Sequence, residues 1–165
     1  MRNAETILTI IRNRGQRGLV VQDVYRLLYQ RNLYLCAYGK LYKNKGAMTE
    51  GVTAETIDGM TLEKIDKIIA LLRDERYRWT PVRRTYVPKK KGSAKFRALG
   101  LPTWSDKLLQ EVIRLILEAY YEPQFSAHSY GFRPNRGCHT ALRGVLQKGR
   151  GTKWYIDGDI SSCFD

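Results

Sequence analysis

The sequence predicts an α+β fold: a mostly helical N-terminal region, one basic β-hairpin, and a single strand at the C-terminal end. Three observations predict it. Apolar residues recur at helical spacing through much of the first 77 residues, β-prone segments flank a lysine-rich turn within 82–101, and the last thirteen residues resemble a short strand. The 165 residues, 43% of them hydrophobic, are enough for one core.

Three helical segments are expected before the hairpin. A short helix spans 4–13, and a longer helical pattern spans 19–43 with a break near Asn32. A loop punctuated by glycines follows over 43–60. Isoleucines and leucines between 62 and 77 are then spaced as the buried face of a third helix.

The segment after the hairpin begins with a helix-capping signal. Thr103 and Asp106 have the spacing of a capping box, in which the threonine side chain accepts a backbone N–H and the aspartate reaches back. The helix that they open has a regular apolar face and is stopped by Pro123. A last helix is expected over 137–147, followed by the terminal strand at 153–165.

The charge of the chain indicates a polyanionic partner. Its formal net charge is +13 and its isoelectric point is near 9.8, values that favour nucleic acid. An anionic membrane surface is the competing partner, but no apolar run reaches the ~18 residues that span a bilayer. Three cysteines without Cys-x-x-Cys spacing argue against a disulfide framework and a structural zinc site, and they indicate a reducing compartment.

The predicted hairpin holds a dense cluster of cations. Residues 83 to 97 include seven basic side chains and no acidic one: Arg83, Arg84, Lys89, Lys90, Lys91, Lys95 and Arg97. A two-stranded ribbon with a basic tip is suited to lie along phosphates, with an affinity that falls steeply as salt rises. The alternative is a solvated edge strand that its lysines protect from aggregation. Edge protection rarely needs seven cations without an acid, so phosphate contact is favoured.

A second cluster lies in the loop 129–137. Tyr130 and Phe132 are interleaved with Arg133 and Arg136, a combination suited to stacking on bases or sugars and to contacting phosphates. Arg136 also stands near the start of the last predicted helix, whose free N–H groups attract anions. Similar clusters occur at ordinary core edges, so this loop by itself leaves both interpretations open.

The terminal strand carries the third cluster. Residues two apart share a strand face, so Asp157 and Asp159 would project together, after a stretch without acidic residues from 123 to 156. Two close carboxylates repel each other unless a cation lies beside them, and Mg²⁺ is bound by one or two carboxylates plus substrate phosphates. A solvated strand end or a turn around Gly158 is the alternative. A two-metal phosphoryl-transfer site needs more ligands than this strand offers.

Several segments occur in the order and spacing of a known enzyme family. They read PVRRTYVPKK, KFRALGLP with the helix after it, SYGFRPNRGCHTAL and WYIDGDISSCFD. The chain resembles the N-terminal half of the group II intron-encoded reverse transcriptases, or maturases, over essentially its whole length. The resemblance implies that 1–152 forms an N-terminal extension and the fingers, and that 153–165 begins the palm.

The resemblance also implies roles for single residues. Lys89 and Arg97 resemble the pair that faces the incoming nucleotide triphosphate. Asp159 resembles the first catalytic metal ligand, with Ile160 as a further contact through its carbonyl oxygen. Phe164 resembles the aromatic gate that favours dNTP over rNTP.

Contacts with nucleic acid are implied in two further segments. The loop that starts with Asn44 and Lys45 resembles an extension that grips the template. The segment 130–134 resembles the wall of the template–primer path. Asp157 receives no metal role.

Two departures from the family pattern concern the hairpin. The usual Arg-Pro-Leu-Gly-Ile-Pro reads Arg-Ala-Leu-Gly-Leu-Pro over 97–102, which affects local stiffness more than chemistry. The stretch from Lys89 to Arg97 is longer than in some relatives, so Lys90 or Lys91 could take the place of Lys89.

The family implies an RNA-directed DNA polymerase and maturase that uses Mg²⁺ and binds intron RNA, an RNA template, a DNA primer and dNTP, with no membrane partner. The Tyr-Ala-Asp-Asp block of the family is not in this sequence, so the chain alone is expected to bind RNA without polymerising. A non-catalytic splicing cofactor and a decayed intron-derived protein are the alternatives. A bacterial cytoplasm is the expected location, with mitochondria left open, and an unpaired strand edge could join two copies as a homodimer.

Overall fold

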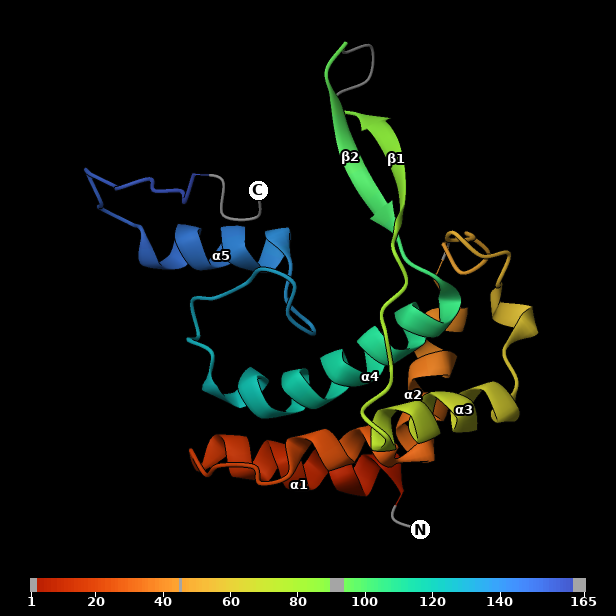
Figure 1. Ribbon diagram of the computed structural model, residues 1–165. Coiled ribbons are helices and arrows are strands. Elements are labelled where there is room, and N and C mark those ends of the chain that lie inside the picture. The colour runs from red at the N-terminus through yellow and green to blue at the C-terminus, as the bar shows by residue number, and fades with distance from the viewer. Residues whose placement is uncertain (1–2, 45, 90–93, 162–165) are drawn as a thin grey trace. The chain divides into compact units, whose positions relative to one another are not determined.

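The computed structural model describes residues 3–44, 46–89 and 94–161, and the chain divides after Gln124 into two compact units. The first unit holds four α-helices and a hairpin that projects beyond them (Figure 1). Its main elements are α1 (Ala4–Gln16), α2 (Arg31–Tyr42), α3 (Leu62–Arg73), β1 (Arg83–Pro88), β2 (Phe96–Leu101) and α4 (Trp104–Tyr121). Short 3₁₀ helices are η1 (Val24–Tyr29), η2 (Ile57–Gly59) and η3 (Glu122–Gln124). The second unit contains α5 (Cys138–Lys148).

Helix α4 is the centre of the core in the first unit. Its apolar residues recur every three or four positions, so one face of the helix is buried against α1 and α2. The buried residues of that face are Leu108, Leu109, Val112, Leu115, Ile116 and Ala119. At the other end of the contact, a Cβ on Gly15 would lie 2.1 Å from the carbonyl oxygen of Tyr120, so only glycine lets α1 approach α4 this closely.

The capping signal at the start of α4 is confirmed, with a different role for its aspartate. The Thr103 hydroxyl accepts the backbone N–H of Asp106 at 3.3 Å, as expected. The Asp106 carboxylate accepts the Thr103 hydroxyl at 2.8 Å, the Tyr77 hydroxyl at 2.6 Å and the Thr80 backbone N–H at 3.1 Å. Asp106 is almost completely buried. Asp106 therefore ties the connector between α3 and β1 to the start of α4.

The hairpin forms as predicted. Strands β1 and β2 pair antiparallel from Arg83↔Leu101 to Pro88↔Phe96, and the Lys89 backbone N–H donates to the Lys95 carbonyl at 2.8 Å. With the helices, it confirms the α+β class.

Three helix boundaries differ from expectation. Helix α1 continues beyond the expected end at residue 13 to Gln16. The segment 19–43 holds the 3₁₀ helix η1 and the α-helix α2, with the break at Gln30. Helix α3 stops at Arg73 because Glu75 adopts a left-handed φ of 56°, and the backbone N–H groups of Arg76 and Tyr77 turn back to the Leu71 carbonyl.

The terminal segment is the main departure from the predicted elements. Residues 153–161 are irregular, while 162–165 lie outside the described residues. A strand is stabilised by ladder hydrogen bonds to a neighbour, and β1 and β2 pair only with each other in the described part of the chain. Trp154, Tyr155 and Ile156 are exposed, as expected for a segment that packs on no sheet. No helix among the described residues is long and apolar enough to cross a bilayer.

Candidate nucleotide and nucleic-acid interface

The two faces of the hairpin carry different side chains. Alternation along each strand and the antiparallel register decide which residues share a face. One face bears the cations Arg83, Lys89, Lys95 and Arg97, with Thr85, Val87 and Leu99 between them. The other face bears Arg84, Tyr86, Pro88, Phe96 and Ala98. The first set is called the cationic face below.

Lys89 and Arg97 are diagonal neighbours on the cationic face. Arg97 lies opposite Val87. Lys89 directly follows the end of β1, and its backbone N–H donates to the Lys95 carbonyl, which continues the strand register by one pair. Such diagonal pairs are about 7–8 Å apart, within reach of one extended anion for side chains of this length. The residues for which the resemblance implies a triphosphate role therefore share a face, whereas Arg84 lies on the opposite one.

The loop 43–56 is held against the hairpin base and the start of α4. Arg83 donates to the Glu50 carbonyl at 2.8 Å, the Trp104 indole to the Ala47 carbonyl at 2.5 Å, and the Lys107 ammonium to the Thr49 carbonyl at 2.6 Å. All three bonds run from a side chain to a loop carbonyl. The loop is thus positioned by its backbone, which leaves the exposed side chain of Asn44 outside these bonds.

Gly51 marks the closest approach in this contact. A Cβ on Gly51 would lie 2.7 Å from the Pro102 carbonyl oxygen and 2.8 Å from the Thr103 backbone nitrogen. A buried glycine is therefore required here by space, not by its backbone angle. Gly51 belongs to the loop for which the resemblance implies template contact, and packing explains why a glycine stands there.

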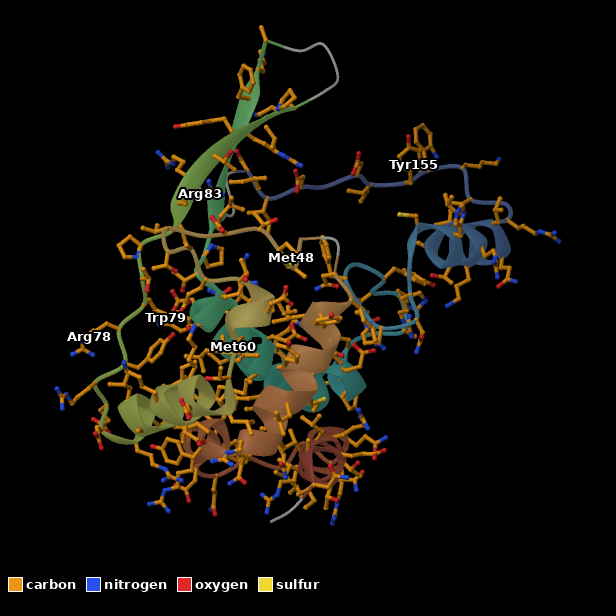
Figure 2. All side chains as sticks on the ribbon, turned by 90° about the vertical axis from the view of Figure 1, so that its right-hand side faces the viewer. Met48, Met60, Arg78, Trp79, Arg83 and Tyr155 are labelled. Carbon is orange, nitrogen blue, oxygen red and sulfur yellow. The ribbon has the colours of Figure 1, made fainter. Side chains whose placement is uncertain are left out.

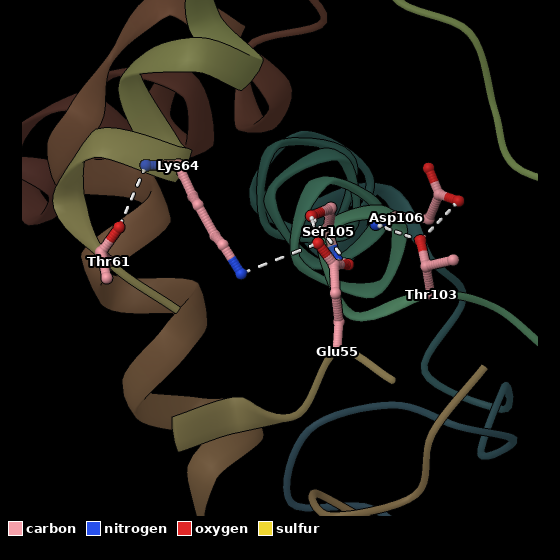
Figure 3. Close-up of polar contacts among 6 residues, drawn as sticks. All are labelled: Glu55, Thr61, Lys64, Thr103, Ser105 and Asp106. Carbon is pink, nitrogen blue, oxygen red and sulfur yellow. Dashed lines mark hydrogen bonds and ion pairs between the residues drawn. The ribbon is translucent and has the colours of Figure 1, made fainter. Parts of the chain in front are cut away.

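Glu55 completes the attachment of the loop (Figure 3). Its carboxylate accepts the Ser105 backbone N–H at 3.3 Å and the Ser105 hydroxyl at 3.1 Å, and it lies 3.9 Å from the Lys64 ammonium. A carboxylate at the first turn of α4 also offsets the partial positive charge there. Burial, reinforced by the charge of Arg83, lowers the pKa of Lys107.

In the second unit, the arginines of the loop 125–137 hold the loop itself. Arg133 donates to the carbonyls of Ser126 and Ser129 at 2.7 and 2.8 Å, and its guanidinium lies 5.2 Å from the centre of the Phe125 ring. Arg136 donates to the Ala127 carbonyl at 2.6 Å and lies over the Tyr130 ring. Much of the hydrogen-bonding capacity of both arginines is therefore used locally, which favours a structural role beside any phosphate contact.

Phe132 differs from its neighbours in this loop. Its side chain is fully exposed, and its φ of 54° is left-handed. Tyr130 is half-buried, because its ring lies under Arg136 and its hydroxyl lies against Gly144. Phe132 is thus better placed than Tyr130 to stack on a base.

The acidic residues of the terminal segment are exposed. The Asp159 carboxylate accepts the Ile160 backbone N–H at 2.9 Å, and Asp157 is exposed as well. Among the described residues, no three Asp, Glu, His or Cys side chains are close enough to hold a metal ion. Carboxylates are the ligands that Mg²⁺ prefers, so the chemistry of Asp159 fits this ion, but the number of ligands is incomplete.

Some predicted site residues lie outside the described part of the chain, and some contacts that form the site were not predicted from the sequence. Four predicted site residues, Lys45, Lys90, Lys91 and Phe164, lie outside the described residues. The sequence reasoning missed the loop attachments made by Glu55, Trp104 and Lys107. Their contacts span 50 to 58 residues, so no local pattern could have indicated them.

Comparison with known proteins places these features in a family. The sequence profile described as "Reverse transcriptase (RNA-dependent DNA polymerase)" matches residues 87–165. The chain is 47% identical over its full length to "Group II intron-encoded protein LtrA" of Lactococcus lactis subsp. cremoris, covering 28% of that protein.

Two eukaryotic relatives agree with this match. The "Uncharacterized 91 kDa protein in cob intron" of Schizosaccharomyces pombe is 44% identical over 93% of this chain and 19% of its own length. "Nuclear intron maturase 2, mitochondrial" of Arabidopsis thaliana is 30% identical over 81% of this chain and 20% of its own length. The chain thus spans less than a third of each of these three relatives. It belongs to the reverse transcriptase family, in the branch of the group II intron-encoded proteins.

Proposed function

We propose that this chain supplies the fingers (1–152) and the first part of the palm (153–165) of an RNA-directed DNA polymerase that also acts as an intron maturase. The observation that carries the proposal is the shared position of Lys89 and Arg97 on the cationic face. The face belongs to a projecting hairpin, and both residues lie within the segment 87–165 that the reverse transcriptase profile matches.

The two cations have complementary chemistry for a triphosphate. The guanidinium of Arg97 presents a planar fork of donors that suits two phosphate oxygens at once, whereas the Lys89 ammonium acts as a compact charge. Phosphoryl transfer leaves little covalent chemistry to the protein, so positioning and charge neutralisation provide most of the catalysis. Lys89 and Arg97 would hold the triphosphate while a primer hydroxyl attacks its α-phosphate.

Asp159 is the proposed metal-binding residue of this segment. Its carboxylate and the carbonyl oxygen of Ile160 would contribute oxygen ligands to Mg²⁺. A bound Mg²⁺ would stabilise the negative charge that develops on the transferred phosphate. Because a complete site needs further carboxylates, the 165-residue chain alone should bind RNA and dNTP without extending a primer.

The expected partners are intron RNA, an RNA template with its DNA primer, and dNTP. Support comes from the net charge of +13 and from residues 76–105, which hold nine cations and no acid. The affinity for RNA should fall steeply with salt, because each neutralised phosphate releases counterions. A variant in which glutamine replaces all four of Lys89, Lys90, Lys91 and Lys95 should show a weaker dependence of RNA affinity on salt concentration.

A chimera tests the polymerase proposal. The chain replaces the matching 28% of the Lactococcus protein, and primer extension on an RNA template is measured. We expect extension by the chimera and its loss in Asp159→Ala, with RNA binding retained. Undiminished synthesis by Asp159→Ala would refute the metal role.

The second candidate is a non-catalytic RNA-binding splicing cofactor, favoured by the incomplete set of metal ligands among the described residues. It predicts a chimera that binds intron RNA and promotes splicing but extends no primer. Splicing and primer extension measured on the same preparation separate the two functions.

A further inference from the structure

The connector between α3 and β1 lines a pocket that the proposed polymerase chemistry does not use. The pocket has a volume of about 410 Å³. Its floor is apolar and includes the buried side chains of Leu28, Leu72 and Leu109. Tyr25 and Trp79 also line it, and about half of each of these side chains is exposed, at 46% and 52%. Figure 2 shows Trp79 next to Arg78 on the connector, before Arg83 at the hairpin base. This site is called the Trp79 pocket.

The aromatic rings of the pocket are held in place from behind. The Tyr25 hydroxyl donates to the Leu72 carbonyl at 3.0 Å. The Trp79 ring packs edge-to-face on Tyr77, with centroids 5.5 Å apart, and Tyr77 is itself bound to Asp106. Rings that are fixed but partly exposed lose little conformational entropy when a flat ligand stacks on them. The pocket is therefore organised for an aromatic ligand.

The charged groups of the pocket suit a nucleotide. Arg78 and Glu75 both line it. One terminal nitrogen of Arg78 donates to the Tyr77 carbonyl at 3.1 Å, so the exposed guanidinium is held at the pocket while other donors remain for a phosphate. Three of its lining residues, Tyr77, Arg78 and Trp79, belong to the segment 76–105, which holds nine cations and no acid. A nucleic acid strand bound to the hairpin would thus meet positive charge along the connector.

We propose that the Trp79 pocket binds one unpaired base of a bound RNA strand and prefers guanine. Trp79 would stack on the base, the leucine floor would bury its edge, and Arg78 would contact the adjoining phosphate. The Glu75 carboxylate only accepts hydrogen bonds, and guanine presents two adjacent donors, the ring N1–H and the 2-amino group. The inference rests on the proposed RNA binding but concerns a site separate from the triphosphate contacts.

The test uses the 165-residue chain and uridine-rich RNA 12-mers in a fluorescence anisotropy titration. Three RNAs are compared, with guanosine, inosine or an abasic site at the central position. Inosine differs from guanosine by lacking the 2-amino group. We expect the guanosine RNA to bind best. Trp79→Ala should weaken its binding about tenfold, the order expected for removing one base–aromatic stack, and should abolish the difference from the abasic RNA. Trp79→Tyr should restore most of the affinity.

Two further variants make the test specific. Trp154→Ala removes another exposed indole, in the second unit, and should leave the guanosine preference unchanged. Glu75→Gln keeps the shape of the side chain but should remove the preference for guanosine over inosine.

Each outcome decides a separate question. Salt-dependent RNA binding that Trp79→Ala leaves unchanged would overturn the pocket proposal and leave the proposed function intact. Absence of RNA binding by the wild-type chain would overturn both. If Trp79→Ala changes the oligomeric state measured by light scattering but leaves the RNA affinity unchanged, the pocket is a contact between copies of the chain and the inference is refuted.

Discussion

The Tyr77 hydroxyl donates to the buried Asp106 carboxylate at 2.6 Å, across a separation of 29 residues. Tyr77 belongs to the connector that leads to β1, and Asp106 lies in the first turn of α4, directly after β2. Both ends of the hairpin are therefore attached to the same buried carboxylate region. The contact also holds the ring on which Trp79 packs. One hydrogen bond thus links core stability to the position of both proposed binding surfaces.

Tyr77→Phe should destabilise the protein by about 1–3 kcal/mol, because it leaves a buried carboxylate oxygen of Asp106 without its donor. Urea denaturation followed by circular dichroism measures the loss. Tyr42→Phe is the matched control, since that ring is 58% exposed, and it should change the stability by less than about 0.5 kcal/mol. Equal stability of the two variants would contradict the role of the Tyr77–Asp106 bond.

Stability should fall as the pH rises above 10. Burial raises the pKa of Tyr34, and burial together with the hydrogen bond to Asp106 raises the pKa of Tyr77. Below pH 10 both phenols are neutral in the folded and unfolded states, whereas above it only the unfolded chain ionises them. Each tyrosine should then cost about 1.4 kcal/mol at one pH unit above its unfolded pKa.

Denaturation midpoints at pH 8, 10 and 11 measure this dependence. The Tyr34→Phe variant should show a smaller fall in stability, measured relative to its own value at pH 8. Lys107 acts in the opposite direction because its pKa is lowered, so stability gained between pH 10 and 11 would indicate that it dominates.

Gly51→Ala should destabilise the attachment of the loop 43–56, because the added Cβ meets the Pro102 carbonyl oxygen at 2.7 Å. We expect a loss of about 1–3 kcal/mol, typical of forced backbone shifts, together with weaker RNA binding. Gly39→Ala is the control: it lies in α2 with open space around it, and it should stabilise the helix by up to about 1 kcal/mol. If Gly51→Ala changed neither the stability nor the RNA affinity, the close packing of the loop at Gly51 would not be required for either.

Arg97, on the cationic face of the hairpin, should affect the KM for dNTP more than Arg84, on the opposite face. In the chimera, Arg97→Ala should raise the KM for dNTP about tenfold, since a charge-assisted hydrogen bond contributes about 1.5–3 kcal/mol. Arg84→Ala, on the opposite face, should leave that KM within about twofold. Steady-state primer extension with varied dNTP measures both. Equal effects of the two variants would exclude a face-specific triphosphate contact.

Local patterns in the sequence determined most of the secondary structure of this protein. The apolar spacing of α3 and α4, the threonine cap at Thr103 and the turn-separated β-prone segments act over a few residues, so they could be recognised without a structure. The basic composition likewise indicated a polyanionic partner, and the order of the motifs indicated the family. The strand expected at 153–165 failed over its described part, because a strand depends on a pairing partner that local sequence does not specify.

The tertiary structure decided how these parts are placed. The register of β1 and β2 separated Arg84 from the cationic face, and contacts over 50 or more residues fixed the loop that contains Gly51. Asp106 was expected to cap a helix, but folding brought Tyr77 and Thr80 to its carboxylate. The sequence alone determined helical periodicity, charge and family, whereas the positions of the binding surfaces depended on long-range packing, because a buried polar group takes whichever partners the fold brings to it.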